Sequence, residues 1–265
     1  MRLLEQARSA EQPSLVYTQA RELLGQAIAQ RPEQPELRLA LANVSMAELA
    51  FTMPADAQAT ALRARAADQY RAVLEVEPTN FRALAGLADV HMVAHTPTDD
   101  GQAVELFERA LEVQPGDSMV ELRLGEALHR LERYQPAEVH LLGSVAACEA
   151  AGDGPGVVNA KNLLGRMYMD QGRMDEAERI LEESVAGLEQ LGDKTSYYGC
   201  PYQALGSLYH QSGRVEESVA AMKRVAELEP HSIDSQLLAA RACREAGDAA
   251  CAELYEGRAQ ALRQR

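Results

Sequence analysis

Apolar and small residues recur in the same order along most of the chain. Leu–Gly pairs are followed twelve residues later by a small residue, and four residues after that by a large apolar one. Three copies show this most clearly: Leu124-Gly125 with Ala137 and Leu141, Leu164-Gly165 with Ala177 and Leu181, and Leu205-Gly206 with Ser218 and Met222. A small residue at both places lets two antiparallel helices approach closely, and the large residue fills the space beside their contact. The pattern therefore predicts helix hairpins.

The small residue of each first helix serves as a ruler for the whole sequence. Its positions are spaced by 34 to 46 residues: Ala42, Ala88, Gly125, Gly165, Gly206 and Ala240. One further hairpin precedes Ala42, where Arg8 replaces the small residue. We therefore expect a single domain over residues 1–265 with seven hairpins and about fourteen helices. The expected units are 1–34, 35–80, 81–117, 118–157, 158–198, 199–232 and 233–265. The hairpin of 35–80 is lengthened, and its tip is expected at Pro54.

This order of residues resembles the tetratricopeptide repeat, whose pattern is W-x2-L-G-x2-Y, then A-x3-F, then a closing proline. Tyr168 and Tyr209 occupy the tyrosine position, and Ala103-x3-Phe107-x2-Ala110-x4-Pro115 matches the second helix. The tryptophan position departs from the pattern, and it holds Leu84, Glu121, Lys161, Tyr202 and Gln236 in successive units. The longer units resemble repeats of the kinesin-light-chain type. The resemblance implies an all-α, right-handed superhelical solenoid with its first helices along the concave face.

Such a fold implies a scaffold or adaptor that binds a peptide or partner segment in its concave groove. Counting from the ruler positions, we expect seven peptide-binding residues: Arg123, Asn159, Asn162, Arg166, Gln203, Ser207 and His210. Amides can hold an extended backbone, and arginines can pair with acidic groups of the partner. Solvated helix faces with locally paired charges are the alternative interpretation. The chaperone-binding carboxylate clamp of this family is not expected, because only Asn43 and Arg123 fit its five positions.

Composition agrees with a helical fold, since apolar residues make up 46% of the chain and aromatic residues only 5%. The formal net charge of −14 argues against nucleic acid as a partner. No apolar stretch is long enough for membrane insertion. The segment from Met1 to Ala10 does not have the pattern of a signal peptide, so the expected location is cytoplasmic. A periplasmic or secreted protein is the alternative, if a signal was removed.

The sequence predicts no enzyme, cofactor or metal site, because the known nucleophile, phosphate and dinucleotide motifs are absent. His91 and His95 have the spacing of metal ligands, but His95 is expected in a turn.

The four cysteines allow one specific alternative. Cys243 and Cys251 flank the turn of the last hairpin and could face one another across it. They are either two buried thiols or a disulfide, and a disulfide would favour an exported assembly factor. A homo-oligomeric structural scaffold formed through the terminal hairpins is a further alternative.

Overall fold

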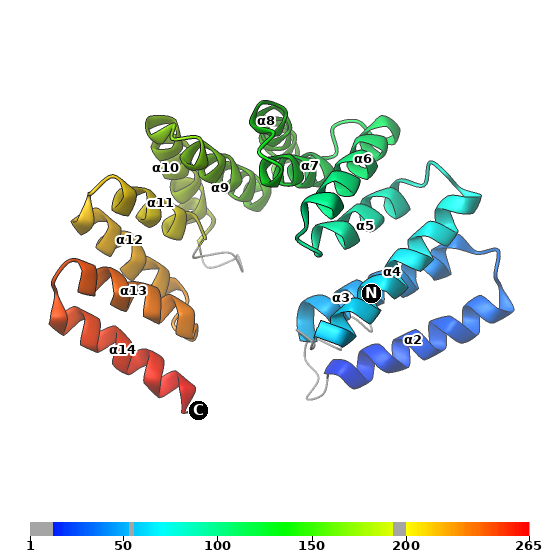
Figure 1. The fold of residues 1–265 in the computed structure, drawn as a ribbon, viewed down its shortest axis with the longest axis horizontal. Coiled ribbons are helices and arrows are strands. Elements are labelled where there is room, and N and C mark those ends of the chain that lie inside the picture. The colour runs from blue at the N-terminus through cyan, green and yellow to red at the C-terminus, as the bar shows by residue number, and fades with distance from the viewer. Residues whose placement is uncertain (1–12, 53–55, 193–199, 265) are drawn as a thin grey trace. The chain divides into compact units, whose positions relative to one another are not determined.

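The computed structural model describes residues 13–52, 56–192 and 200–264. Within these residues the chain forms thirteen α-helices and no strand (Figure 1). The all-α prediction is therefore confirmed. The first helix expected for residues 1–34 and the hairpin tip expected at Pro54 lie outside the described residues.

The chain divides into two compact units, Met1–Arg133 and Tyr134–Arg265. The first contains α2(Pro13–Gln30), α3(Pro35–Thr52), α4(Asp56–Val76), α5(Phe81–Met92), α6(Pro97–Val113) and α7(Ser118–Arg130). The second contains α8(Tyr134–Ala151), α9(Gly154–Asp170), α10(Met174–Leu191), α11(Cys200–Gln211), α12(Val215–Leu228), α13(Ile233–Glu245) and α14(Ala249–Arg263). Inside each unit every helix packs on the next one, and alternate helices such as α9 and α11 are also in contact.

The small ruler residues lie where the helices approach most closely. Gly125, Gly165 and Gly206 are all buried, as predicted. A Cβ at Gly165 would lie 2.5 Å from Leu181 Cγ, and a Cβ at Gly206 would lie 3.0 Å from Met222 Cε. Leu181 and Met222 are the large apolar residues of the sequence pattern, so the repeat is a packing motif.

In five of the described hairpins, the turn between the two helices contains one residue with positive φ. Seven residues after the ruler position, Gly172, Gly213 and Gly247 have φ between 72° and 77°. Glycine adopts this left-handed conformation without a steric cost, whereas residues with a Cβ do so at a cost of about 1–2 kcal/mol. His95 and Glu132 occupy the same place in the α5–α6 and α7–α8 turns, with φ of 54° and 58°.

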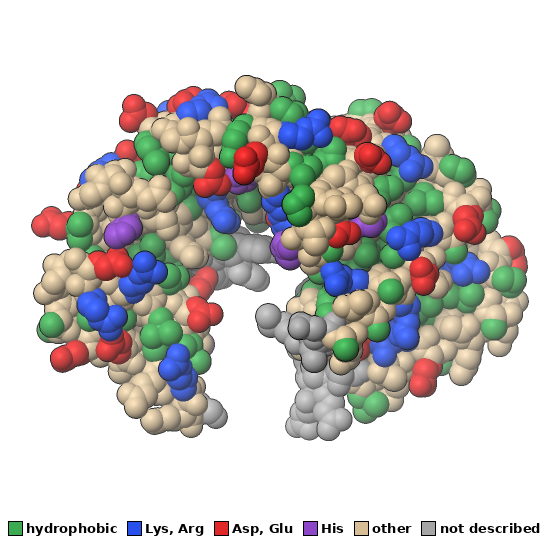
Figure 2. Space-filling view, viewed as in Figure 1, with side chains coloured by type: hydrophobic (Ala, Val, Ile, Leu, Met, Phe, Trp, Pro, Cys, Tyr) green, Lys and Arg blue, Asp and Glu red, His purple; other side chains and the backbone are tan. Residues whose placement is uncertain are grey.

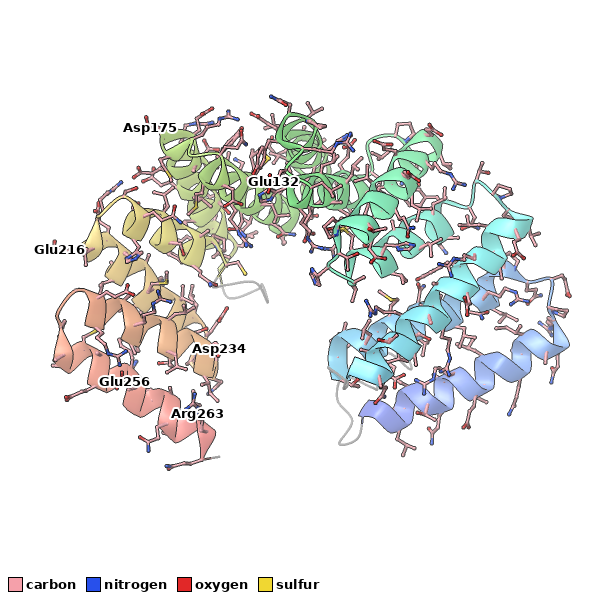
Figure 3. All side chains as sticks on the ribbon, in the orientation of Figure 1. Glu132, Asp175, Glu216, Asp234, Glu256 and Arg263 are labelled. Atoms are coloured by element: carbon pink, nitrogen blue, oxygen red, sulfur yellow. A yellow bond between two sulfur atoms is a disulfide. The ribbon has the colours of Figure 1, made fainter. Side chains whose placement is uncertain are left out.

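Charges at the helix ends follow the helix dipole. Asp175, Glu216 and Asp234 lie in the first turns of α10, α12 and α13, and Arg263 lies in the last turn of α14 (Figure 3). Acidic groups at helix N-termini and basic groups at C-termini are stabilised by this dipole. On the face drawn in Figure 2, acidic and basic side chains are interspersed. Part of the acidic excess therefore has a local role in stabilising helices.

Candidate functional site

Six of the seven predicted site residues lie on two helices of the second unit. Asn159, Asn162 and Arg166 are on α9, and Gln203, Ser207 and His210 are on α11. These two helices are in contact, although α10 lies between them in the sequence. Arg123 lies on α7 in the first unit.

A hollow of about 260 Å³ lies between α9 and α11. Its lining is Arg166, Met169, Asp170, Cys200, Gln203, Ala204 and Ser207. The Arg166 side chain is exposed and makes no ion pair or hydrogen bond with any described residue. The Gln203 side chain is also exposed, and the hydroxyl of Ser207 donates to the Gln203 carbonyl at 2.9 Å. One cationic and one amide side chain are therefore presented together to solvent.

A second hollow of about 220 Å³ continues the first one along α11 to α13, and Ser207 lines both. His210, Arg241 and Glu245 are among its wall residues. Arg241 Nε donates to Glu245 at 2.8 Å, and His210 Nδ1 lies 3.5 Å from the same carboxylate. The hydrogen bond from Arg241 lowers the pKa of Glu245, so this carboxylate stays charged. His210 therefore lines the second hollow, but its ring already lies beside the carboxylate of Glu245.

Asn162, expected from the sequence to bind a peptide, does not lie on an exposed face. Its residue is only 5% exposed, and Oδ1 is buried without a hydrogen-bond partner among the described residues. It lines a small pocket of about 20 Å³ with Asn159, Pro155 and Leu188. The helix offset counted from Gly165 gave the correct side of α9, but α10 and α11 close over this position. Asn159 remains half-buried at the same pocket.

Arg123 belongs to a charged network inside the first unit. Its guanidinium lies 2.9 Å from Glu126 and 3.6 Å from Asp89. Glu126 also pairs with Arg130 at 2.7 Å, and Arg130 reaches Asp100 at 3.3 Å. Burial raises the pKa of Asp89, while Arg123 opposes that shift. Much of the charge of Arg123 is therefore already balanced within its own unit.

Four residues that line the α9–α11 hollow are not among the seven expected from the sequence: Met169, Asp170, Cys200 and Ala204. Cys200 stands six residues before Gly206, at the offset that identified Asn159 before Gly165, so the same rule could have found it. It lines both the small pocket and the larger hollow. Partial burial raises the pKa of its thiol, Glu229 adds to this, and Arg166 opposes it. Cys148 is buried and Cys243 is bonded to Cys251, so Cys200 is the one exposed thiol of the described cysteines.

The two histidines with metal-like spacing have other roles. His91 Nδ1 lies 2.9 Å from Asp99, and His95 is the positive-φ residue of the turn. The described residues contain no cluster of three or more groups that could hold a metal ion. Among the helices that the structure describes, none combines the length and apolar character of a membrane span.

Comparisons with known proteins agree with this architecture. The tetratricopeptide repeat family model matches residues 117–190 and again 156–228. The sequence matches no protein of curated function.

Three solved structures illustrate the fold. A chain of the APC/C hetero-tetramer Cut9-Hcn1 is 15% identical with a TM-score of 0.67; the match covers 98% of this chain but only 45% of that one. PilW, a type IV pilus biogenesis factor, is 19% identical with a TM-score of 0.64, covering 86% of this chain and 92% of PilW. YrrB, a TPR protein with an unusual peptide-binding site, is 21% identical with a TM-score of 0.54, covering 85% of this chain and all of YrrB. At these identities the likeness concerns the fold alone.

The family match lies in the middle of the chain, and the same helix hairpins continue on both sides of it. Repeats of this kind generally form scaffolds for protein interaction and are not catalytic. Residues 117–228 therefore belong to the tetratricopeptide repeat family.

Proposed function

We propose that this protein is an interaction scaffold that holds an extended peptide segment of a partner along α9, α11 and α13. The observation that carries this proposal is the pair of adjoining hollows that share Ser207. Most pockets that bind ligands are concave and carry a few polar groups in fixed positions. Here those groups come from two rigid helices that pack directly against one another.

The chemistry of the walls favours a peptide with an acidic group. Arg166 lacks a partner among the described residues, and a guanidinium can bind a carboxylate through two hydrogen bonds. The amide of Gln203 can pair with a peptide backbone beside it. A chain with a net charge of −14 repels acidic partners in general, so Arg166 would select where such a group docks.

Selection from a displayed library of random dodecapeptides, followed by calorimetry with the selected peptides, tests this function. Arg166→Ala with Gln203→Ala should weaken binding by about 2 kcal/mol, or roughly thirtyfold, because a few central residues usually carry most of the interface energy. Arg179→Ala is the matched control, since Arg179 is an equally exposed arginine on α10 that pairs only with Glu183 in the described residues. The contribution of Arg166 should also fall as the salt concentration rises.

Cys200 provides an independent footprint of the same groove. A peptide in the hollow should slow alkylation of Cys200 in the native protein, without any change at the buried Cys148. Selected peptides that bind the double variant as tightly as the natural chain, and leave Cys200 reactive, would place the interaction surface elsewhere.

A second candidate function is supported by the Cys243–Cys251 disulfide. Disulfides persist in oxidising compartments, so we propose an exported assembly factor as the alternative. PilW, which has a similar fold, is a type IV pilus biogenesis factor, and this agrees with an assembly role. The similarity does not identify what this chain would assemble. The number of free thiols distinguishes a cytoplasmic protein from an exported one. It is counted on protein taken from its natural source and denatured without reductant. Two free thiols support export, and four free thiols exclude it.

A further inference from the structure

Two successive hairpins differ at the position that corresponds to the tryptophan of the repeat pattern. Tyr202 and Gln236 each stand four residues before the ruler residue of their first helix. The Tyr202 ring is buried in a cluster with Leu188 and Val225, and its hydroxyl donates to Glu189 at 2.5 Å. The guanidinium of Arg224 lies 6.0 Å from the centre of this ring.

At Gln236 the structure has a hollow of about 320 Å³ instead of a ring. It lies between the end of α12, the start of α13 and the last turns of α14. Arg258 and Leu262 form part of its wall, and they are the counterparts of Arg224 and Leu228 in the preceding hairpin. The last hairpin therefore repeats two of the residues near the Tyr202 ring, but it has Gln236 in place of the tyrosine.

The Gln236 amide is only half satisfied. Its residue is 1% exposed, and Nε2 donates to the Ala226 carbonyl at 2.9 Å. Oε1 is buried and has no hydrogen-bond partner among the described residues. Buried acceptors are nearly always paired in folded proteins, so this oxygen has a free acceptor position for a water molecule or for a donor of a bound partner.

We propose that this hollow receives a tyrosine side chain of a partner protein. The incoming ring takes the place that Tyr202 fills in the preceding hairpin, next to Leu262 and Ala261. Arg258, which lies 5.0 Å from the centre of the Tyr255 ring, supplies a cation beside it. The phenol hydroxyl donates to Gln236 Oε1, since tyrosine combines an apolar ring with a polar tip. None of these residues lines the α9–α11 hollow, so the proposal does not depend on the peptide groove.

Titration of the full chain with N-acetyl-tyrosinamide, followed by NMR of backbone and side-chain amides, tests the proposal. We expect saturable shifts of the Gln236 side-chain amide and of His231, which lines the same hollow. N-acetyl-phenylalaninamide should bind about tenfold more weakly, because it lacks the donor and leaves Oε1 unpaired.

Gln236→Tyr is the decisive variant, because it fills the hollow with the chain's own ring, as at Tyr202. It should raise the melting temperature and abolish the shifts caused by the tyrosine probe. Gln260→Tyr, at an exposed position of α14 outside the hollow, is the control. It should change neither the melting temperature nor the shifts caused by the tyrosine probe. Arg258→Gln removes the cation but keeps a polar side chain, and it should weaken the probe several-fold in a folded protein. Equal affinity for the phenylalanine probe, or unchanged binding by Gln236→Tyr, would overturn the proposal.

Discussion

The α9–α10 and α13–α14 hairpins share one backbone plan but differ at four equivalent positions. The first has Gly165, Tyr168, Arg173 and Glu176, where the second has Ala240, Cys243, Asp248 and Cys251. In α9–α10 the guanidinium of Arg173 lies 4.1 Å from the centre of the Tyr168 ring. It also donates to Glu176 at 2.7 Å and to Glu138 of α8 at 2.9 Å. This arrangement fastens the hairpin to the helix before it.

The α11–α12 hairpin repeats the arrangement with new residues. Arg214 lies 4.2 Å from the centre of the Tyr209 ring and donates to Glu217 and to Glu178 of α10. A cation held between a ring and two carboxylates therefore connects each of these hairpins to its predecessor.

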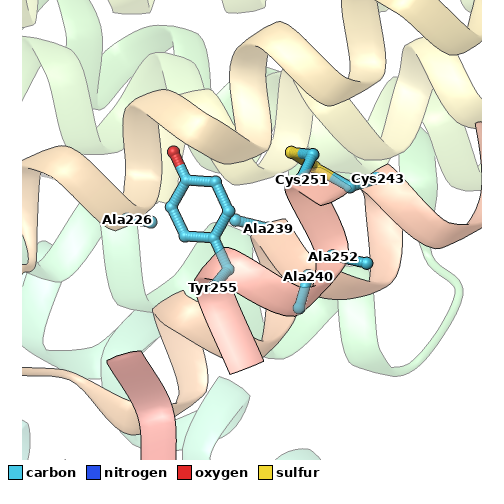
Figure 4. Close-up of a cluster of buried hydrophobic side chains, with 7 residues drawn as sticks. All are labelled: Ala226, Ala239, Ala240, Cys243, Cys251, Ala252 and Tyr255. Carbon is cyan, nitrogen blue, oxygen red and sulfur yellow. A yellow bond between two sulfur atoms is a disulfide. The ribbon is translucent and has the colours of Figure 1, made fainter. Parts of the chain in front are cut away.

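In α13–α14 the connection is covalent and lies within the hairpin. Cys243 and Cys251 form a disulfide with their Cα atoms 5.7 Å apart, beside the buried ring of Tyr255 (Figure 4). Asp248 replaces the arginine and caps α14, accepting from the Cys251 amide at 3.0 Å. Among the described helices, the backbone of α14 lies close to α13, and Tyr255 of α14 shares a buried cluster with Ala226 of α12. The comparison shows that α9–α10 and α11–α12 are each connected to the helix before them through an arginine, whereas α13–α14 is cross-linked within itself.

The largest effect is expected from Gly165→Leu. A Cβ there already lies within 2.6 Å of two atoms of Leu181, which is fully buried. Overpacking should lower the free energy of unfolding by about 3 kcal/mol or more, measured by chemical denaturation. Gly257→Leu is the control, because nothing lies within 4 Å of a Cβ at that position. Equal stability of the two variants would contradict the close approach of α9 and α10.

A smaller loss is expected when the covalent connection is removed. Cys243→Ala with Cys251→Ala should lower the free energy of unfolding of the last hairpin by about 2–3 kcal/mol, since the disulfide closes a short loop in the unfolded chain. Hydrogen exchange of α14 amides reports this locally. Reduction of the natural chain should produce the same loss, and reduction of the double variant should change nothing.

The smallest loss is expected at the electrostatic connections. Arg173→Ala and Arg214→Ala should each lower the melting temperature by less than the double cysteine variant does. Their guanidinium groups are partly exposed, so water and salt screen the ion pairs. The difference from the natural chain should shrink at high salt, whereas the effect of the disulfide should not. A salt-independent loss would indicate that the stacking on tyrosine dominates.

The stability of the natural chain and of Arg173→Ala can also be compared as the pH is lowered. Hydrogen bonds from Arg173 and then Tyr168 lower the pKa of Glu138 below its ordinary value of 4.5. A lowered pKa in the folded state stabilises the fold above the ordinary value, and this contribution disappears as the pH falls through the folded pKa. Below pH 4.5 the natural chain should therefore lose stability more steeply than Arg173→Ala.

The sequence by itself determined the helices and their pairing. The Leu–Gly pairs, the small residues twelve positions later and the large residues beyond them act within one hairpin, where the contacts are fixed by helix geometry. For the same reason Cys243 and Cys251 could be recognised as neighbours across a turn. Counting from the glycines gives the direction of each side chain, and Arg166, Gln203 and Ser207, which were chosen in this way, line one hollow in the structure.

Only the tertiary structure decided what happens between hairpins. The burial of Asn162 under α10 and α11, the reach of Arg173 to Glu138, and the hollow at Gln236 all depend on how one hairpin stacks on the next. Such contacts join side chains from different hairpins, and their geometry follows from local helix lengths and side-chain volumes. Periodicity indicates which face of a helix a residue occupies, but the neighbouring hairpin determines whether that face is covered, paired or left open.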